Sequence, residues 1–452
     1  MKKFFSSTLF LMGSMALVCA QSNSSSVASE GEANTATVNQ TGETNVSSIG
    51  QNGTNNLASV RQGSETFRAF GSYAEQTQTG SDNIASIEQE EVGNSAWQLQ
   101  QGTANTAFIG QNLLTFGEGN ESIQVQIGDE NEAITTQEGI GNSATITQGS
   151  ELFASNGGVA VQDQFGLFNE AEIVQEEFDN TATQIQDGVE NLATVEQNLI
   201  AFGGGNVATQ TQIGEQNEAI TIQDGSDNEA IVNQGSFFFP SVGGFAGQVQ
   251  DGESNFAIIT QEEFDNEAIQ LQTGSNNVAE IEQNLFFFGG NNSAIQDQIG
   301  TDNRAFTFQD GNGNSALTVQ GSFFFSSRNG LAVIEQIGDD NNAFINQEED
   351  LNEGRQLQLG SGNDASIIQN LILFGGENLA VQNQLGDFNM ASTTQDGEFN
   401  ISNMLQSGNN NMAMDVQFGV SNSATTTQTG SFHSSTISQT GIGNVATVTQ
   451  SN

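Results

Sequence analysis

Hydrophobic and polar positions alternate in short runs along this chain. In "NEAITTQEGIGNSATITQGS", residues 131–150, Asn131 and Gln137 recur in the next run as Asn142 and Gln148. Within each run Asn, Ala, a variable residue and Gln follow one another at steps of two residues. This spacing places all four on one face of an extended strand. A helix would need an apolar stripe that recurs about every 3.6 positions, and this pattern has none. The chain is therefore predicted to form many short strands.

The Gln position fixes the register of the repeat. Gln recurs in 35 units, mostly with the step that leads from Gln40 to Gln51 and Gln62, and a longer step follows at intervals, as from Gln62 to Gln78. Asn lies six positions before this Gln in 30 of the units, Ala usually four before it, and Gly usually two after it. The unit is N-x-A-x-(V/I/T/Q)-x-Q-x-G-x-x. Gly readily adopts positive φ, so each unit is predicted to be one strand followed by one tight arc.

Such a strand can bury its face only by stacking on copies of itself. At a spacing of about 4.7–4.8 Å, Gln would lie over Gln and Asn over Asn, and the amides would form ladders. A buried amide without a partner would cost about 1–3 kcal/mol, so the ladder would also fix the register. The predicted fold is an all-β solenoid in which two strand-arc units form one rung with facing strands. Representative ladder residues are Gln137, Gln148, Gln428, Gln439, Gln450, Asn131, Asn142, Asn422 and Asn444.

A longer repeat, with a period of 86, is superimposed on the short one. It is marked by the segments "NLLTFGEGN" (112–120), "NLIAFGGGN" (198–206), "NLFFFGGNN" (284–292) and "NLILFGGEN" (370–378). Two further marks are "GSELFASNGG", "GSFFFPSVGG" and "GSFFFSSRNG", from Gly149, Gly235 and Gly321, and "QEE", from Gln89, Gln175, Gln261 and Gln347. Each block contains seven units, an odd number, so equivalent loops of successive blocks should emerge on opposite edges of the solenoid. The full repeat would then be two blocks, or roughly 34 Å at about 4.8 Å per rung.

The inserted loops concentrate phenylalanine. These side chains could fold onto one another and cover the edge of the solenoid, or they could form apolar patches for lateral association or attachment. The candidate interaction residues are Phe237, Phe238, Phe239, Phe286, Phe287, Phe288, Phe323, Phe324 and Phe325.

Residues 1–20 differ from the rest of the chain and indicate export. Lys2 and Lys3 precede an apolar run and a small-residue site at Val18-Cys19-Ala20, as in a secretory signal peptide. A lipoprotein anchor on Cys19 is the alternative. Without residues 1–20 the chain keeps five Arg against 54 acidic residues, a charge of 5 − 54 = −49, which argues against nucleic-acid or anionic-membrane partners. No other segment is apolar enough to insert into a membrane.

The repeat resembles the curlin repeat of bacterial functional amyloid. "NSATITQ" and "QTGIGNVATVTQ" are particularly similar, and the resemblance covers residues 34–452. It implies a β-solenoid that is exported and assembles with itself outside the cell into cross-β fibres for adhesion and biofilm matrix. It also implies an outer-membrane secretion pore and a surface nucleator as partners, and a flexible secretion-targeting segment at 21–33. Common curlins have far fewer units and no long aromatic loops, which leaves open whether this chain is a main or a specialised subunit.

Residue types that carry chemistry are scarce. Beyond position 20 there is no Cys and no Lys, and the one histidine, His433, occupies a position that is usually Asn. Paired acids such as Glu176-Glu177 recur with the repeat, whereas a catalytic pair would be singular. Turn sequences such as "GDEN" would suit weak Ca²⁺ ligation, but solvated charge explains them better. We predict no catalytic, cofactor or metal site.

Two functional hypotheses remain. The first is an extracellular structural protein that builds or joins a curli-like fibre by templated pairing of its end strands. The alternative is a monomeric surface adhesin or ligand-binding solenoid that uses its Phe-rich loops. An ice-binding solenoid would need regular outward Thr-x-Thr arrays, which the sequence lacks.

Overall fold

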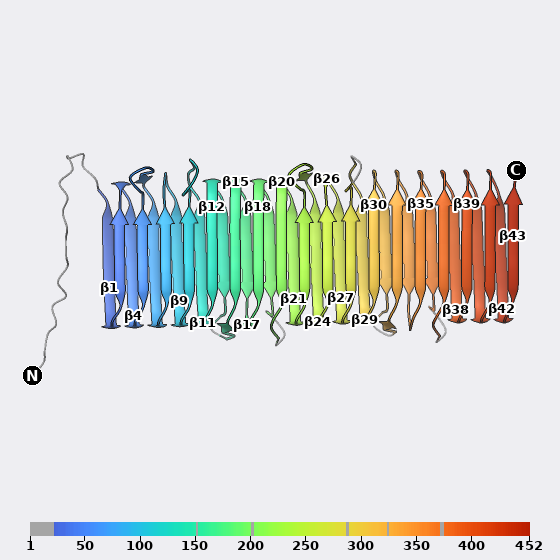
Figure 1. Cartoon of the computed structure of the whole chain (residues 1–452), viewed down its shortest axis with the longest axis horizontal. Coiled ribbons are helices and arrows are strands. Elements are labelled where there is room, and N and C mark those ends of the chain that lie inside the picture. Colours follow the sequence, from blue (N-terminus) through green and yellow to red (C-terminus); the bar gives the residue numbers. More distant parts are fainter. Residues whose placement is uncertain (1–21, 151, 200–202, 286–288, 323–324, 371–374) are drawn as a thin grey trace, which may run out of the picture.

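The computed structural model describes residues 22–150, 152–199, 203–285, 289–322, 325–370 and 375–452. The predicted fold class is confirmed, because these residues form a β-solenoid of two long, facing parallel sheets (Figure 1). The predicted signal peptide, residues 1–20, lies outside the described residues. Within the described ranges, no helix is long and apolar enough to span a membrane.

Successive long strands alternate between the two sheets. The first sheet contains β1 (Ser24–Glu32), β4 (Val46–Thr54), β7 (Tyr73–Ser81), β9 (Ser95–Thr103), β11 (Glu121–Asp129), β13 (Ser143–Gln148), β16 (Glu170–Gln175), β19 (Leu192–Gln197), β21 (Glu218–Ser226), β24 (Phe245–Glu253), β27 (Glu267–Ser275), β29 (Ser293–Thr301), β31 (Ser315–Gln320), β34 (Asn342–Gln347), β36 (Asp364–Gln369), β38 (Met390–Glu398), β40 (Met412–Val420) and β42 (Ser434–Ile442).

The second sheet contains β2 (Thr35–Gln40), β5 (Leu57–Gln62), β8 (Ile84–Gln89), β10 (Thr106–Gln111), β12 (Glu132–Ile140), β15 (Val159–Leu167), β18 (Thr181–Val189), β20 (Val207–Glu215), β22 (Glu229–Gln234), β25 (Phe256–Gln261), β28 (Val278–Gln283), β30 (Arg304–Asp310), β33 (Leu331–Ile337), β35 (Glu353–Leu359), β37 (Leu379–Leu385), β39 (Ile401–Ser407), β41 (Ser423–Thr429) and β43 (Val445–Ser451). Short strands in the arcs are β3 (Gly42–Glu43), β6 (Ala69–Phe70), β14 (Ser155–Asn156), β17 (Glu177–Phe178), β23 (Ser241–Val242), β26 (Glu263–Phe264) and β32 (Ser327–Arg328).

The strand register follows the repeat. Val46 in β4 lies beside Ser24 in β1, so one rung spans two of the short units. Where a loop is inserted the offset between neighbours grows, as between Ser95 and Glu121 or between Val46 and Tyr73. In both of these cases Gln still pairs with Gln. The loops therefore bulge out of the arcs without shifting the stack.

The core is narrow because small residues face it. Along a strand such as β13, the second, fourth and sixth residues are buried, and these are Ala144, Ile146 and Gln148. Ala, the variable residue and Gln share the inward face, as the spacing of two predicts. Burial of the Ala and Ile side chains stabilises the fold by about 25 cal/mol per Å² of apolar surface removed from water.

The arcs need unusual backbone angles. Gly139, two residues after Gln137, has φ of +116°, and a Cβ there would lie 2.0 Å from the carbonyl oxygen of Gly166 in the next rung. Only Gly fits such a close approach. The residue before the ladder Asn is also left-handed even where it is not Gly, as at Phe168 (φ 55°) and Asp227 (φ 55°).

Equivalent loops of successive blocks lie on opposite edges, as the odd number of units predicts. The loop after β10 leads from the second sheet to the first, whereas the loop after β19, one block later, leads from the first to the second. Figure 1 shows neighbouring loops projecting in groups, first from one edge and then from the other. The structural repeat is therefore two blocks.

The segment 21–33, expected to be flexible, contains a strand. Ser24–Glu32 forms β1, which pairs along its whole length with β4 and is exposed throughout. The physical reason is that β1 adds to the open edge of the first sheet and satisfies the backbone groups of β4. A role of this segment in secretion stays a prediction.

Candidate assembly site: amide ladders, end faces and loops

The inward Gln side chains are hydrogen-bonded to one another along each sheet. Gln137 Nε2 donates to Gln164 Oε1 in the next rung at 2.8 Å, and both side chains are buried. Its second hydrogen is directed to backbone carbonyls, with Nε2 2.9 Å from the oxygen of Glu121 and 3.0 Å from that of Asn142. The buried amide therefore has its hydrogens satisfied by the stack.

The same bond repeats without a break in both sheets, from each Gln to the Gln of the next rung. In the first sheet Gln148 donates to Gln175 at 3.0 Å, and the ladder continues to Gln439. In the second sheet it runs through Gln428 to Gln450, with the last bond at 2.8 Å. Every bond has the same sense: the N–H points toward the C-terminal end of the solenoid.

The Asn side chains form columns of the opposite sense. Asn131 Nδ2 donates back to Asn105 Oδ1 at 3.1 Å, and Asn444 Nδ2 donates back to Asn422 Oδ1 at 2.8 Å. The backbone N–H of Asn142 donates in the same direction, to Asn120 Oδ1 at 2.9 Å. The bonds between Asn residues therefore run toward the N-terminal end, against the Gln ladders, while Asn131 Nδ2 also donates to the Ser155 carbonyl of the next rung at 2.6 Å.

The Asn columns are interrupted, unlike the Gln ladders. The loops that begin with Gly-Ser, from Gly149, Gly235 and Gly321, are called GS loops. After each of them the Asn position holds another residue, as at Gly158, whose backbone N–H still donates to Asn131 Oδ1 at 3.0 Å. A Cβ at Gly158 would lie only 2.7 Å from Ser155 Oγ, because the returning loop fills the space of the Asn side chain. The columns consequently stop and restart at these loops.

The two ends of the solenoid expose complementary groups. Gln51 Oε1, at the N-terminal end of the first-sheet ladder, is buried and accepts no hydrogen bond from the described residues. At the other end, Gln439 Nε2 and Gln450 Nε2 each donate to one backbone carbonyl, of Ser423 and Ser434, and to no further described group. In the Gln ladders, acceptor oxygens therefore lie at the N-terminal end and donor N–H groups at the C-terminal end.

The end strands have free edges as well. Among the described residues, β1 pairs with β4 alone and β2 with β5 alone, while β42 pairs with β40 alone and β43 with β41 alone. Asn422 is buried, but Asn444 is exposed and Gln450 is half-buried, because no further rung covers them. Unpaired strand edges of this kind invite another strand.

A second, shorter Gln ladder runs through the variable core position. Gln76 donates to Gln98 at 2.8 Å, Gln98 to Gln124 at 2.9 Å, and Gln124 to the Thr135 hydroxyl of the facing sheet at 3.0 Å. The oxygen of Gln76 has no partner in the described structure. The sequence showed Gln at this position without revealing that it forms its own ladder.

Acidic residues anchor both loop types, which the sequence analysis missed. The Glu138 carboxylate accepts backbone N–H bonds from residues 113–115, at 2.9 to 3.2 Å, and the Thr115 hydroxyl at 2.7 Å. The available signal was an acid at the same place in each block, at Glu138, Asp224, Asp310 and Asp396.

In two of the QEE marks the first Glu contacts the other loop type, which begins with Gly-Ser. The hydroxyl of Ser236 hydrogen-bonds Glu262, and that of Ser322 hydrogen-bonds Glu348. Burial raises the pKa of both carboxyls, and the Ser hydrogen bonds oppose that rise. The QEE mark and the GS loop thus repeat together because they touch across one rung.

The Phe-rich loops expose apolar surface where they are described. Phe237 is 86% exposed and Phe238 is 82% exposed, with their rings in T-shaped contact at 5.4 Å. Phe239 and Phe325 are less exposed. The candidates Phe286, Phe287, Phe288, Phe323 and Phe324 lie outside the described residues.

His433 and Asp415 are two polar residues near the C-terminal end. The His433 N–H donates to Asn411 Oδ1 at 3.0 Å, in place of an Asn backbone N–H. Asp415 is fully buried at the variable core position and accepts from the Ser402 hydroxyl at 2.8 Å and the Thr426 hydroxyl at 3.3 Å. Burial raises the pKa of the Asp415 carboxyl, and these two hydrogen bonds oppose the rise.

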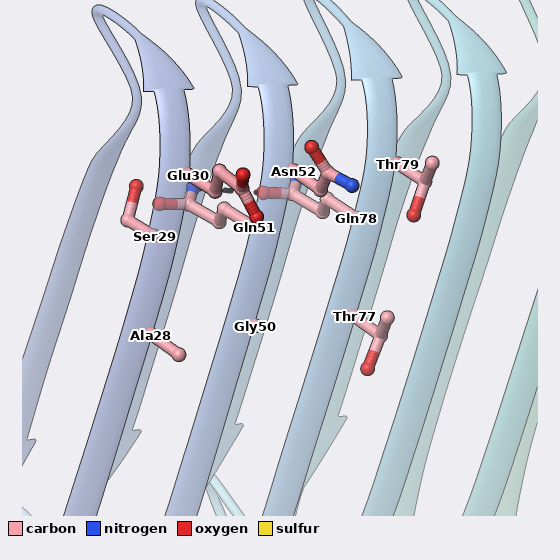
Figure 2. Close-up of a pocket in the computed structure, with 9 residues that line it drawn as sticks. All are labelled: Ala28, Ser29, Glu30, Gly50, Gln51, Asn52, Thr77, Gln78 and Thr79. Atoms are coloured by element: carbon pink, nitrogen blue, oxygen red, sulfur yellow. Dashed lines mark hydrogen bonds between the residues drawn. The ribbon is translucent and has the colours of Figure 1, made fainter.

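Figure 2 shows a shallow hollow near the N-terminal end, over β1, β4 and β7. Ala28 and Gly50 leave its floor almost bare of side chains, and Glu30 is its one ionisable group. In the part of the chain that the structure describes, no three His, Cys, Asp or Glu side chains gather to hold a metal ion.

The family comparison agrees with this geometry. A model of the curlin associated repeat matches residues 31–63, 300–348 and 419–451. In these three segments the chain is similar to the curlin associated repeat. The matched curlin repeats lie at both ends of the solenoid and in its second half, and the strand register continues unchanged between them. No curated protein matches the chain.

Proposed function

We propose that this protein is an extracellular structural protein, without catalytic activity, that forms or joins curli-type amyloid fibres for cell adhesion and biofilm matrix. The curlin repeats and the solenoid fold support the broad assignment to a fibre subunit. The adhesive and matrix roles are what the family resemblance implies. A function of this class needs stacking surfaces rather than a reaction centre.

The observation that carries the proposal is the complementarity of the two ends. One copy presents the unused N–H groups of Gln439 and Gln450, and the next presents its first rung, β1 and β2, in which Gln40 begins the second-sheet ladder. Head-to-tail stacking would extend both sheets by backbone pairing and would continue the Gln ladder of the second sheet. Each added copy would recreate the same open end, so growth would be templated.

Export and surface attachment complete the proposal. Residues 1–20 would direct secretion, residues 21–33 would be read by an outer-membrane pore, and a surface nucleator would start the fibre. The large negative charge, −47 for the full sequence, would keep the chain soluble until assembly. The protein itself would be the main partner.

Fibre formation by the purified protein, without residues 1–20, tests the proposal. We expect fibres whose diffraction shows the cross-β spacings of about 4.7 Å and about 10 Å. A protein that stays monomeric at high concentration in the presence of seeds would instead support the alternative function.

That alternative is a monomeric adhesin or ligand-binding solenoid, and the exposed rings of Phe237 and Phe238 favour it. It predicts binding of the monomer to hydrophobic surfaces, with loss of binding when both rings are replaced by Ser. The fibre proposal predicts that the same variant still polymerises.

A further inference from the structure

Strand β1 is a repeat unit with one altered residue. Asn23 Oδ1 accepts the backbone N–H of Asn45 at 3.0 Å, as a ladder Asn does, and Gly31 has the positive φ of the arc glycines, 110°. In this register the Gln position of the unit is Ser29, which pairs directly with Gln51. A search anchored on Gln cannot find this unit, although its Asn and Gly are in step.

Ser29 ends the Gln ladder of the first sheet. Figure 2 shows Ser29 in line with Gln51 and Gln78, where only the second pair is hydrogen-bonded, at 2.9 Å. The Ser hydroxyl lies too close to its own backbone to reach the next rung, so Gln51 Oε1 stays buried and without a partner among the described residues. In the second sheet the ladder continues to the first strand, with Gln40 donating to Gln62 at 2.8 Å.

We propose that β1 and β2 form the face that receives a second copy of this chain, and that Ser29 makes the joint between copies weaker than the solenoid interior. The inference rests on the proposed fibre function. When β1 and β2 follow β42 and β43 of the second copy, Gln450 of that copy meets Gln40 and the second-sheet ladder continues. Gln439 of the second copy meets Ser29, so the first-sheet ladder is broken at every joint.

The variant Ser29→Gln tests this directly. Its amide would donate to Gln51 Oε1 within the chain and accept from Gln439 of the second copy. We expect the critical concentration for fibre formation to fall about tenfold, the factor given by one net hydrogen bond between the copies, and fibres to resist shear better. Ser26→Gln is the matched control, because Ser26 is on the outward face of the same strand, where its hydroxyl meets that of Ser48 at 3.2 Å.

A double-mutant cycle shows whether the effect arises at the joint. Residues 29 and 439 lie at opposite ends of one solenoid, in β1 and β42, so they can couple only across two copies (Figure 1). The gain from Ser29→Gln should shrink several-fold in a Gln439→Ala background. An equal gain in both backgrounds would overturn the proposal, because residue 29 would then act only within its own chain.

Two further outcomes have separate meanings. If the parent protein forms fibres whose critical concentration is unchanged by Ser29→Gln, the inference about the joint is wrong while the fibre function stands. If neither protein forms fibres, the proposed function itself fails. Removal of residues 21–33 should raise the critical concentration, and a truncated protein that assembles as well as the parent would also contradict the inference.

Discussion

Asp415 is a carboxyl at a core position where the units before and after it carry Met404 and Thr426. Because burial raises its pKa, the folded state favours the protonated form. The charged form destabilises the fold fully above the folded-state pKa, and this cost disappears as the pH falls below the unfolded value. Asp415→Asn should therefore stabilise β39 to β41 at pH 7 by about 1–3 kcal/mol, and much less at pH 3.

Hydrogen exchange of these strands would measure the effect, since it reports local opening free energies. Asp227→Asn is the control, because Asp227 is exposed in an arc and should change the local opening free energy little. Equal stabilisation by Asp415→Asn at both pH values would contradict the assignment to protonation.

At the scale of the element, each arc depends on its glycine. Gly139→Ala should lower the local opening free energy of β12 by about 3 kcal/mol or more, because the new Cβ would meet a backbone oxygen of the next rung at 2.0 Å. Gly119→Ala is the matched control: its φ is also positive, +69°, but no atom lies within 4 Å of its Cβ site. It should cost only the backbone strain, about 1–2 kcal/mol. Similar losses at both sites, measured by hydrogen exchange, would show that the close approach does not matter.

Substitutions in the strands and in the loops should affect assembly differently. Replacing Gln428, Gln439 and Gln450 by Ala should strongly slow fibre growth, because each change leaves neighbouring amides unpaired at about 1–3 kcal/mol apiece. Replacing Phe286, Phe287 and Phe288 by Ser should leave growth nearly intact and should alter bundling or binding to hydrophobic surfaces. Dye-binding kinetics and electron microscopy would measure both, and the reverse result would mean that the assignment of ladder and loop is wrong.

At the scale of the whole molecule, charge opposes assembly. Without residues 1–20 the formal charge is −49, so added salt should speed fibre growth by screening, since the Debye length falls to about 10 Å at 0.1 M. Lower pH should act in the same direction. Burial raises the pKa of Glu282 and Asp297, so protonation favours the folded chain as the pH falls through their folded-state values. The growth rate would be measured in a titration with NaCl, and KCl at equal ionic strength is the control. Fibre growth that slows as either salt is added would contradict this account.

Much of the fold was predictable because one side-chain spacing encodes it. The alternation within a strand and the constant step between units specify strand, face and register together, and the odd number of units per block places the loops on alternate edges. The repeat unit that contains Ser29 was not predicted, because the units were located by their Gln residues. The role of Glu138 was not predicted because most of its loop contacts are backbone N–H groups, so the recurring acid has no recurring side-chain partner in the sequence. The sense of the amide ladders is decided by side-chain rotation, which residue identity does not specify.

The opposed senses of the Gln and Asn columns bear on how two chains find each other. A row of aligned amides behaves like a row of dipoles and leaves a fraction of a unit charge at each end, as a helix does. Because the Asn–Asn bonds run the other way, the Asn columns oppose these fractions on each end face. Two chains of like charge would then approach with no long-range attraction toward the correct end. Correct docking would depend on contacts made within a few ångströms, so most encounters would separate and elongation would be far slower than diffusion allows.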